Sequence, residues 1–230
     1  MIVVHHLNNS RSQRILWLLE ELGVPYEIKR YQRDAKTMLA PPELRAIHPL
    51  GKSPVITDGG LTLAESGAIV EYLADRYGAG TLMPAPGTPA RLRCSYWLHY
   101  AEGSAMPPLL LKLVFRRIET APAPFFVKPI ARGIAHKVQH GFVDPQLKLQ
   151  LDYLEGEVGA SGWFVGEQLS VADIQLSFPL EAFAARGGLD AAHYAKLSAW
   201  LQRIHARPAY QRALQRGGEY RLGGRAGAPA

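Results

Sequence analysis

The stretch GKSPVITDGGLTLAESGAIVEYLADRYG, residues 51–78, decides the fold of the first part of the chain. Two short apolar segments, PVIT and LTLA, are joined through the Asp-Gly-Gly sequence at residues 58–60, which is typical of a β-hairpin. A helical pattern of apolar residues then begins near Glu65. We therefore predict two antiparallel strands followed by a helix.

The residues before this stretch predict a strand, a helix and a second strand. Residues 1–7, MIVVHHL, and 26–31, YEIKRY, have the character of strands. Between them, one helical face that ends before Gly23 is formed by Ile15, Leu18, Leu19 and Leu22. A strand-helix-strand order gives a parallel pair, to which the hairpin adds antiparallel strands. The resulting βαβ-ββα order is that of a thioredoxin-like α/β unit.

Beyond residue 78 the pattern becomes helical. The glycine- and proline-rich segment 78–90 is a predicted linker. We expect helices near 88–118, 171–186 and 194–206, and a further apolar stripe formed by Leu147, Leu151, Leu154 and Val158. The aromatic, proline-interrupted segment 119–130 is expected to be a packed loop before another helix.

These patterns predict two domains and a tail. Residues 1–80 form the thioredoxin-like domain and residues 88–218 an all-helical domain, while residues 219–230 are expected to be a mobile tail. Within the helical half, SVADI places Ser170 and Asp173 at the spacing of a capping box, which is a structural motif. We therefore do not count Asp173 as a site residue.

Composition limits the possible partners. The 230 residues are 47% hydrophobic, enough for a proper core, and carry a formal net charge of +6. The basic residues are scattered, and much of the excess is contributed by the tail and by Arg116, Arg117, Lys128, Arg132 and Lys137. This is a weak nucleic-acid signal, so we predict no nucleic-acid partner.

Membrane and redox signals are equally sparse in the sequence. No apolar run approaches the roughly 18 to 20 residues that span a bilayer, and the N-terminus lacks the layout of a signal peptide. We therefore expect a cytoplasmic protein without a membrane partner. The single cysteine, Cys94, excludes an intrachain disulfide and any all-cysteine metal site.

The sequence Asn8-Asn9-Ser10 opens the first predicted helix directly after a strand. Asn9 or Ser10 can cap the helix by accepting a hydrogen bond from a backbone N–H, which contributes about 1 kcal/mol. Alternatively, the same polarised helix start can hold an anion. The local sequence leaves both interpretations open.

Several motifs together resemble the cytosolic glutathione transferase family. In chain order they are SRSQRILWLLEELG, GKSPV, LAESGAIVEYL and LSVADI, and the resemblance covers about residues 2 to 210. The bacterial and fungal, Gtt1-like branch is most similar in LNNSRSQRILWLLEELG and YWLHYAEGSAMPPLL. The resemblance implies a detoxifying transferase with glutathione as co-substrate, no metal, and a homodimeric assembly.

The resemblance also implies a glutathione site. Lys52, Ser53 and Pro54 correspond to a segment with a cis X-Pro bond, against which the ligand peptide binds like an extra strand. Glu65 would take the ammonium and Ser66 the carboxylate of the γ-glutamyl group. Without the resemblance, Pro54 is an ordinary turn proline and Glu65 an acidic residue at a helix start.

The same comparison makes Ser10 and Asn9 the candidates for stabilising a thiolate. No cysteine lies near residue 10, so the reactive sulfur must come from the ligand. We prefer Ser10 because it leads directly into the helix start, where N–H groups converge. Asn9 remains the alternative, since an amide NH₂ can also donate to sulfur.

In the family, the helical half supplies an apolar wall for a small hydrophobic electrophile. The candidates in this chain are Tyr96, His99, Tyr100, Gly103 and Met106. Aromatic residues at helical spacing also fill cores and subunit interfaces, so both interpretations stay open. His99 is not expected to bind a metal, because no second ligand lies nearby.

The predicted reaction is attack of a glutathione thiolate on an electrophilic carbon or a peroxide oxygen. Two alternatives remain: a glutathione-dependent disulfide reductase, and a non-catalytic module of the same fold that binds apolar ligands or proteins.

Overall fold

A computed structural model describes residues 1–222 apart from residues 35, 36, 38, 187 and 219. The predicted mobile tail, 219–230, therefore falls mainly on positions outside the described residues.

The first half of the chain contains a four-stranded mixed sheet. The elements are β1 (Ile2–Leu7), α1 (Ser12–Leu22), β2 (Tyr26–Tyr31), α2 (Pro42–Ile47), β3 (Val55–Asp58), β4 (Leu61–Ala64) and α3 (Ser66–Tyr77). The strand order is β2-β1-β3-β4, with β1 and β2 parallel and the other pairs antiparallel. The predicted parallel pair and hairpin are both confirmed, and the fold class is a thioredoxin-like α/β unit.

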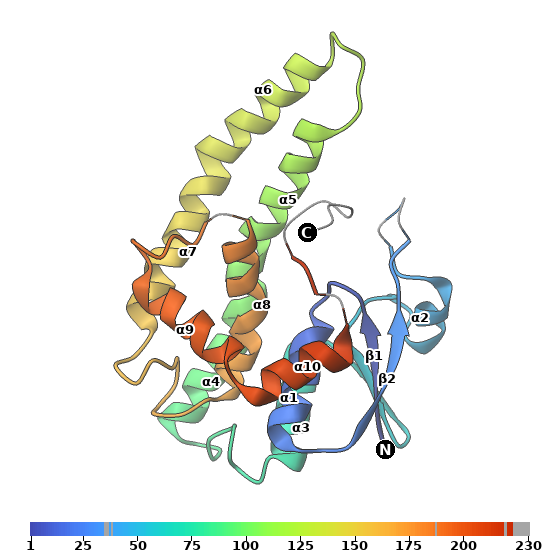
Figure 1. Cartoon of the computed structure of the whole chain (residues 1–230), viewed down its shortest axis with the longest axis vertical. Coiled ribbons are helices and arrows are strands. Elements are labelled where there is room, and N and C mark those ends of the chain that lie inside the picture. The colour runs from blue at the N-terminus through green and yellow to red at the C-terminus, as the bar shows by residue number, and fades with distance from the viewer. Residues whose placement is uncertain (35–36, 38, 187, 219, 223–230) are drawn as a thin grey trace.

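Helices cover both faces of this sheet (Figure 1). The apolar stripe of α1 is buried as predicted, with Ile15, Leu18 and Leu19 fully inaccessible. Gly23 ends α1 in the left-handed conformation, at φ 65°. On the opposite face, Leu44 of α2 packs in a small separate cluster with β1 and β2. The first turn of α1 is held against the end of β1, because Ser12 Oγ lies 2.8 Å from Nδ1 of His6.

The second half is helical. Its elements are α4 (Pro89–Tyr100), the π-helical turn η1 (Ala101–Ala105), α5 (Met106–Thr120), α6 (Lys128–Val138), η2 (Gln139–Val143), α7 (Asp144–Glu157), α8 (Val171–Ala185), α9 (Ala195–His205) and α10 (Pro208–Gly217). α4, η1 and α5 follow one another without a break, so one long helical segment leads from the body of the protein into a projecting hairpin (Figure 1).

Helix α8 is the centre of the helical half (Figure 1). It is buried on all sides from Val171 to Phe183. The predicted capping box is present: Ser170 Oγ accepts from Ala172 N at 3.3 Å, and Asp173 Oδ2 accepts from Ser170 N at 3.0 Å. Asp173 Oδ1 also accepts from the Trp200 indole N–H at 2.9 Å. Asp173 is therefore a fully buried structural residue.

We expect Asp173→Asn to lower the free energy of unfolding by about 2 kcal/mol, because an amide NH₂ would face a backbone donor that the carboxylate now satisfies. Urea unfolding monitored by circular dichroism measures this loss. Asp190→Asn, at an exposed site, is the control and should change the free energy little. An unchanged midpoint for Asp173→Asn would contradict the structural role.

The two halves are joined along α1 and α10. Arg207, directly before α10, forms a two-pronged ion pair with Glu21 of α1, with N–O distances of 2.6 and 2.8 Å. The neighbouring Glu20 accepts hydrogen bonds from both Arg212 and Arg216 of α10 at 2.7 and 2.8 Å. These contacts fix the first helix, and hence its N-terminal turn, relative to the helical half.

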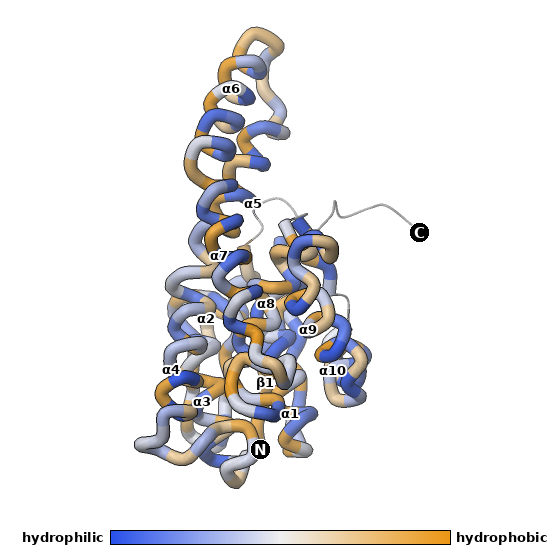
Figure 2. Tube along the Cα trace, turned by 90° about the vertical axis from the view of Figure 1, so that its left-hand side faces the viewer, coloured by the Kyte–Doolittle hydropathy of each residue, from blue (hydrophilic) through white to orange (hydrophobic). Residues whose placement is uncertain are grey.

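The prediction of a packed loop over 119–130 is wrong. Phe125 and Phe126 are 86% and 64% exposed. The reason lies in the arrangement of the helices: α5 and α6 pack against each other and extend beyond the rest of the protein, so no other element covers their connection (Figures 1 and 2). A sequence pattern of aromatics and prolines does not reveal whether a neighbouring element is present.

Within the described residues, no helix is long and apolar enough to cross a membrane.

Candidate active site

Ser10 lies where β1 turns into α1. Asn9 makes this turn at φ 51°, a left-handed conformation that asparagine tolerates better than most residues. Ser10 is only 4% exposed, and its hydroxyl accepts a hydrogen bond from Ser12 N at 3.2 Å and lies 3.5 Å from Ser53 Oγ. The structure thus brings together two residues, Ser10 and Ser53, that the sequence analysis selected from motifs more than 40 positions apart.

Ser53 connects β3 to the end of β1. Its hydroxyl donates to the His5 carbonyl oxygen at 2.9 Å and accepts from Leu7 N at 3.3 Å. The Ser53–Pro54 peptide bond is cis, as the resemblance implies. Pro54 is buried and Lys52 is exposed beside it. The edge formed by this segment is therefore next to the Ser10 hydroxyl.

A buried chain of polar groups supports Ser10. Ser12 Oγ lies 2.7 Å from Ser10 Oγ and 2.8 Å from Nδ1 of His6. Burial, with a smaller contribution from Arg30, lowers the pKa of His6 to about 4. The imidazole is therefore neutral at pH 7, and it takes part in hydrogen bonds without adding charge. The sequence analysis treated His6 only as part of a strand and missed this arrangement.

Ser66 belongs to a second polar cluster at the start of α3. Its hydroxyl accepts from Nη2 of Arg14 at 2.6 Å. The same Arg14 nitrogen donates to Glu102 Oε1, and Nη1 donates to the Gln175 carbonyl oxygen at 2.5 Å. Arg11 adds an ion pair from Nε to Glu102 Oε2 at 3.0 Å. Residues from α1, α3, η1 and α8 converge on this one guanidinium.

Electrostatics in this cluster favour ionised groups. Burial alone would raise the pKa of Glu102, but Arg14 and Arg11 outweigh it and hold that pKa below the usual range. Burial lowers the pKa of Arg14, yet a guanidinium stays protonated in proteins. Two cations therefore face one carboxylate beside Ser66, which leaves an excess of positive charge there.

Arg14 and Glu102 are functional candidates that the sequence analysis missed. The spacing of Arg11 and Arg14, three residues apart at the start of a helix, was the available signal. Glu102 lies in the YWLHYAEGSAMPPLL motif, but its contact with Arg14 joins residues 88 positions apart. Such a contact cannot be seen in local patterns.

Glu65 has an unusual backbone conformation. It precedes α3 at φ 67° and ψ 115°, its side chain makes no capping hydrogen bond, and the residue is exposed. A non-glycine residue at such angles costs about 1–3 kcal/mol and is most often found at functional sites. The strain therefore favours a ligand-binding role for Glu65 over an ordinary helix start.

Asn9, the alternative to Ser10, has its side-chain oxygen engaged elsewhere. Asn9 Oδ1 accepts from the backbone N–H of Arg221 at 2.5 Å. The adjacent Tyr220 donates to Glu181 Oε2 of α8 at 2.5 Å. Asn9 is therefore tied to the C-terminal segment, whereas Ser10 faces Ser53.

The candidates for the electrophile wall occupy different environments. Tyr96 and Tyr100 stack on each other with ring centroids 5.8 Å apart, and both hydroxyls bond to α7, to Tyr153 and Gln150 respectively. His99 and Gly103 are exposed, and Met106 is part of the core. The aromatic pair thus has a packing role in the protomer, and the pocket role of all five residues stays a prediction.

Within the described residues, no group of three or more histidine, cysteine, aspartate or glutamate side chains is arranged to hold a metal ion. Cys94 is fully buried, and burial raises the pKa of its thiol to about 11. A thiol in this state is a poor nucleophile.

A thioredoxin-like unit with a cis-proline edge, joined to an all-helical half, defines the glutathione S-transferase architecture. Residues 1–75 match the family described as "Glutathione S-transferase, N-terminal domain", and residues 138–208 match "Glutathione S-transferase, C-terminal domain". Glutathione S-transferase 3 of Schizosaccharomyces pombe is 38% identical, over 94% of this chain and 88% of the relative. The chain belongs to the glutathione S-transferase family and is a glutathione transferase.

Further relatives support the bacterial and fungal, Gtt1-like branch. Glutathione S-transferase 1 of Saccharomyces cerevisiae is 36% identical, over 91% of this chain and 92% of the relative. The crystal structure of a glutathione S-transferase from Actinobacillus pleuropneumoniae matches with a TM-score of 0.78 and 37% identity, covering 96% of this chain and 94% of that chain. A sphingomonad glutathione S-transferase complexed with glutathione matches with a TM-score of 0.70 and 26% identity, over 94% of this chain and 98% of that chain.

Proposed function

We propose that this chain binds glutathione along the Ser53–Pro54 edge, stabilises the thiolate with the Ser10 hydroxyl, and transfers it to a small hydrophobic electrophile. The observation that carries the proposal is the 3.5 Å approach of Ser10 Oγ to Ser53 Oγ, which puts a hydroxyl donor beside the edge where a peptide would pair. Cys94 cannot replace the ligand sulfur, because it is buried and protonated.

The thiol requires substantial activation. A thiol with a pKa of about 8.5 is mostly protonated at pH 7, and lowering that pKa by about 2 units takes roughly 2.7 kcal/mol. A hydrogen bond to a charged group contributes about 1.5–3 kcal/mol, so one Ser10 O–H can supply much of this. The start of α1 adds a favourable dipole.

The γ-glutamyl end of glutathione carries an ammonium and a carboxylate. Ser66, supported by the Arg14 guanidinium, is suited to the carboxylate, and Glu65 to the ammonium. Glu102 is a second acceptor for the ammonium, since it lies next to Ser66 at 3.5 Å. Residues 1–80, together with Glu102 of the helical half, would thus hold glutathione, and residues 88–218 would supply the electrophile site.

In the proposed reaction, the thiol proton leaves to solvent and the thiolate lone pair forms a C–S bond with the electrophilic carbon. A leaving group departs with the electron pair of the broken bond, or, where the attacked carbon belongs to an activated double bond, the π-electron pair moves onto the neighbouring carbon and its electron-withdrawing group and takes up a proton from solvent. The binding of both reactants side by side adds to the rate. We place this activity in the cytoplasm.

Turnover of three substrates tests the proposal: a chloronitroaromatic, an organic hydroperoxide and a mixed disulfide, each with glutathione. Conjugation of the chloronitroaromatic supports transfer to carbon, and turnover of the hydroperoxide alone would assign a peroxidase. Reduction of the mixed disulfide alone would assign a disulfide reductase. Glutathione binding without any turnover would instead identify a non-catalytic binding module.

We expect Glu65→Ala to weaken glutathione binding about fivefold, corresponding to about 1 kcal/mol for one charge-assisted hydrogen bond. Isothermal titration calorimetry measures the dissociation constant. Glu71→Ala, at a half-buried position of α3, is the control and should bind glutathione like the parent. Equal affinity for both variants would show that Glu65 only precedes the helix and takes no part in glutathione binding.

We also propose a homodimer, because the apolar helical half, with exposed aromatic residues such as Tyr96 and Phe142, offers a face for a symmetric contact. Sedimentation velocity at micromolar concentration should show twice the mass of one chain. A single species of monomer mass would refute this assembly.

A further inference from the structure

The α5–α6 hairpin projects from the body of the protein and ends in an uncovered apolar tip (Figure 1). We call residues 116–134 the hairpin tip. Its exposed apolar side chains are Ile118, Phe125, Phe126, Val127, Ile130 and Ile134. Figure 2 shows hydrophobic residues at the turn, with hydrophobic and hydrophilic residues mixed along α6. The two phenyl rings contact each other edge to face, with centroids 5.5 Å apart, at the convex end of the molecule.

The hairpin is also where the positive charge of the chain is concentrated. Between residues 106 and 143 the sequence has six basic residues, Lys112, Arg116, Arg117, Lys128, Arg132 and Lys137, against one acidic residue, Glu119. The segment thus carries a net charge of +5 out of +6 for the whole chain. Arg116, Arg117, Lys128 and Arg132 are exposed on the hairpin tip itself.

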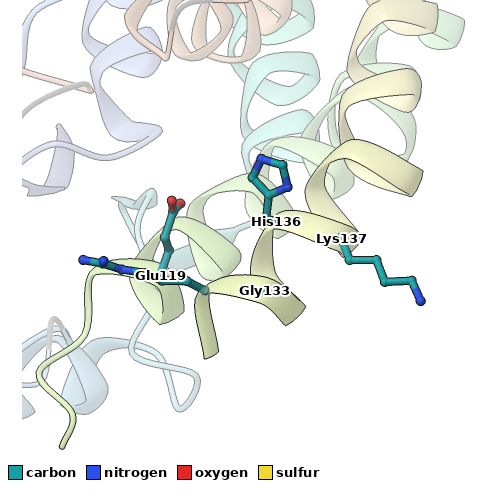
Figure 3. Close-up of a pocket in the computed structure, with 5 residues that line it drawn as sticks. Glu119, Gly133, His136 and Lys137 are labelled. Atoms are coloured by element: carbon teal, nitrogen blue, oxygen red, sulfur yellow. The ribbon is translucent and has the colours of Figure 1, made fainter. Parts of the chain in front are cut away.

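The cationic side chains do not converge on one small ligand. A hollow of about 500 Å³ between α5 and α6 is lined by Glu119, Arg132, Gly133, His136 and Lys137. In Figure 3 the Lys137 amine points away from this hollow, while the Glu119 carboxylate lies on its other side. The charge is therefore spread over a surface, which suits an extended anionic partner.

We propose that the hairpin tip adsorbs to the surface of an anionic phospholipid bilayer, with Phe125 and Phe126 entering the interface and the surrounding cations facing lipid headgroups. Apolar side chains combined with a basic surround are the two signals that stable peripheral binding requires. The absence of a membrane-spanning segment, on which the sequence analysis based its prediction of no membrane partner, does not bear on a surface contact.

The charge argues against a second copy of the chain as the occupant of the tip. A symmetric contact between two tips would bring together two segments that each carry a net charge of +3, from four basic residues and Glu119, and like charges in an interface are unfavourable. A folded partner protein would need a groove complementary to the convex pair of phenyl rings. A bilayer surface deforms around such a pair. An anionic bilayer satisfies both the charge and the shape.

Co-sedimentation of the full chain with vesicles tests the proposal. We expect binding to phosphatidylcholine vesicles that contain phosphatidylserine, little binding to phosphatidylcholine alone, and release by salt. Phe125→Ser combined with Phe126→Ser should lower the partition coefficient by about tenfold or more, since both rings lose their apolar contact. Lys128→Gln should lower it about fivefold, the usual effect of one cation near such a surface.

Two matched variants and two further measurements make the test decisive. Leu92→Ser removes an equally exposed apolar residue on α4, and Lys148→Gln an exposed cation on α7; both should bind vesicles like the parent. Conjugation of the chloronitroaromatic should be unchanged in the hairpin variants, so failure here is separate from failure of the proposed enzyme activity. No binding of the parent chain to anionic vesicles, or equal binding by the phenylalanine variant, would overturn the proposal. Loss of a dimer in sedimentation velocity on substitution of both phenylalanines would assign the tip to a subunit contact instead.

Discussion

Ser10→Ala is expected to raise the thiol pKa of bound glutathione by about 1–2 units and thereby to lower turnover at pH 7 by about threefold to twenty-five-fold. The substitution removes the hydroxyl that lies 3.5 Å from Ser53 Oγ, while the backbone N–H groups of the α1 start remain. If the parent thiol pKa lies about 2 units below the free value of about 8.5, the thiolate fraction at pH 7 falls about threefold for a rise of 1 unit and about twenty-five-fold for a rise of 2 units. The ultraviolet absorbance of the bound thiolate as a function of pH measures the shift directly.

Asn9→Ala is the matched control for this experiment. Asn9 adjoins Ser10, but its side-chain oxygen bonds to Arg221 N, so its removal should leave the thiol pKa nearly unchanged. A raised pKa in Asn9→Ala alone would transfer the donor role to Asn9. If neither variant shifts the pKa, both residues serve only to shape the helix start.

The fold could be predicted from the sequence because its signals are local. Strand length, the Asp-Gly-Gly turn at 58–60 and the apolar stripe of α1 each depend on residues within a few positions. The same holds for the capping box of Ser170 and Asp173, whose hydrogen bonds span three residues. Hydrophobic periodicity identifies the buried face of such an element without any knowledge of which other element packs against it.

The candidate site could be predicted only where it coincides with a motif. Ser10, Ser53 and Ser66 each lie in a recognisable segment, but the partners that support them come from elsewhere in the chain. His6 supports Ser10 through Ser12, and Arg14 supports Ser66 while pairing with Glu102. A charge or an imidazole in a sequence does not show which neighbour tertiary packing will give it. The prediction of a packed loop over 119–130 was wrong for the same reason, since the burial of Phe125 depends on what packs against that segment.

The Arg14 guanidinium is the point at which the two halves depend on each other most. It is fully buried and bonds to α3, η1 and α8 at once. A buried ion pair can contribute nothing net to stability, because the cost of desolvating both charges offsets their attraction. Removal of one partner, however, leaves the other charge buried and unpaired. The cost of losing Arg14 should therefore exceed the net contribution of the pair itself.

We expect Arg14→Leu to lower the free energy of unfolding by about 3–5 kcal/mol, the usual cost of breaking a buried pair. Urea unfolding gives this value. A double-mutant cycle with Glu102→Gln separates the interaction energy of the Arg14–Glu102 pair from the contribution of the hydrogen bonds to Ser66 and Gln175. Arg91→Leu is the control: Arg91 forms a two-pronged pair with Asp75 at 2.8 Å, but on the surface, where a loss of about 1 kcal/mol or less is expected. Equal losses in the two variants would contradict a special role for Arg14.

The pH dependence of the Arg14 effect has a definite sign. The pKa of Glu102 lies below the usual range in the folded protein, because its arginine partners outweigh burial. The stability that this carboxylate contributes is therefore fully present above the unfolded-state pKa of about 4.3, and it is lost as the pH falls through the lower folded-state value. The parent chain and Arg14→Leu should thus converge in stability on acidification, whereas the parent and Arg91→Leu should differ little at any pH above this range. A stability difference between the parent and Arg14→Leu that persists undiminished below the folded-state pKa would show that the loss comes from packing and from the bonds to Ser66 and Gln175, not from the ion pair.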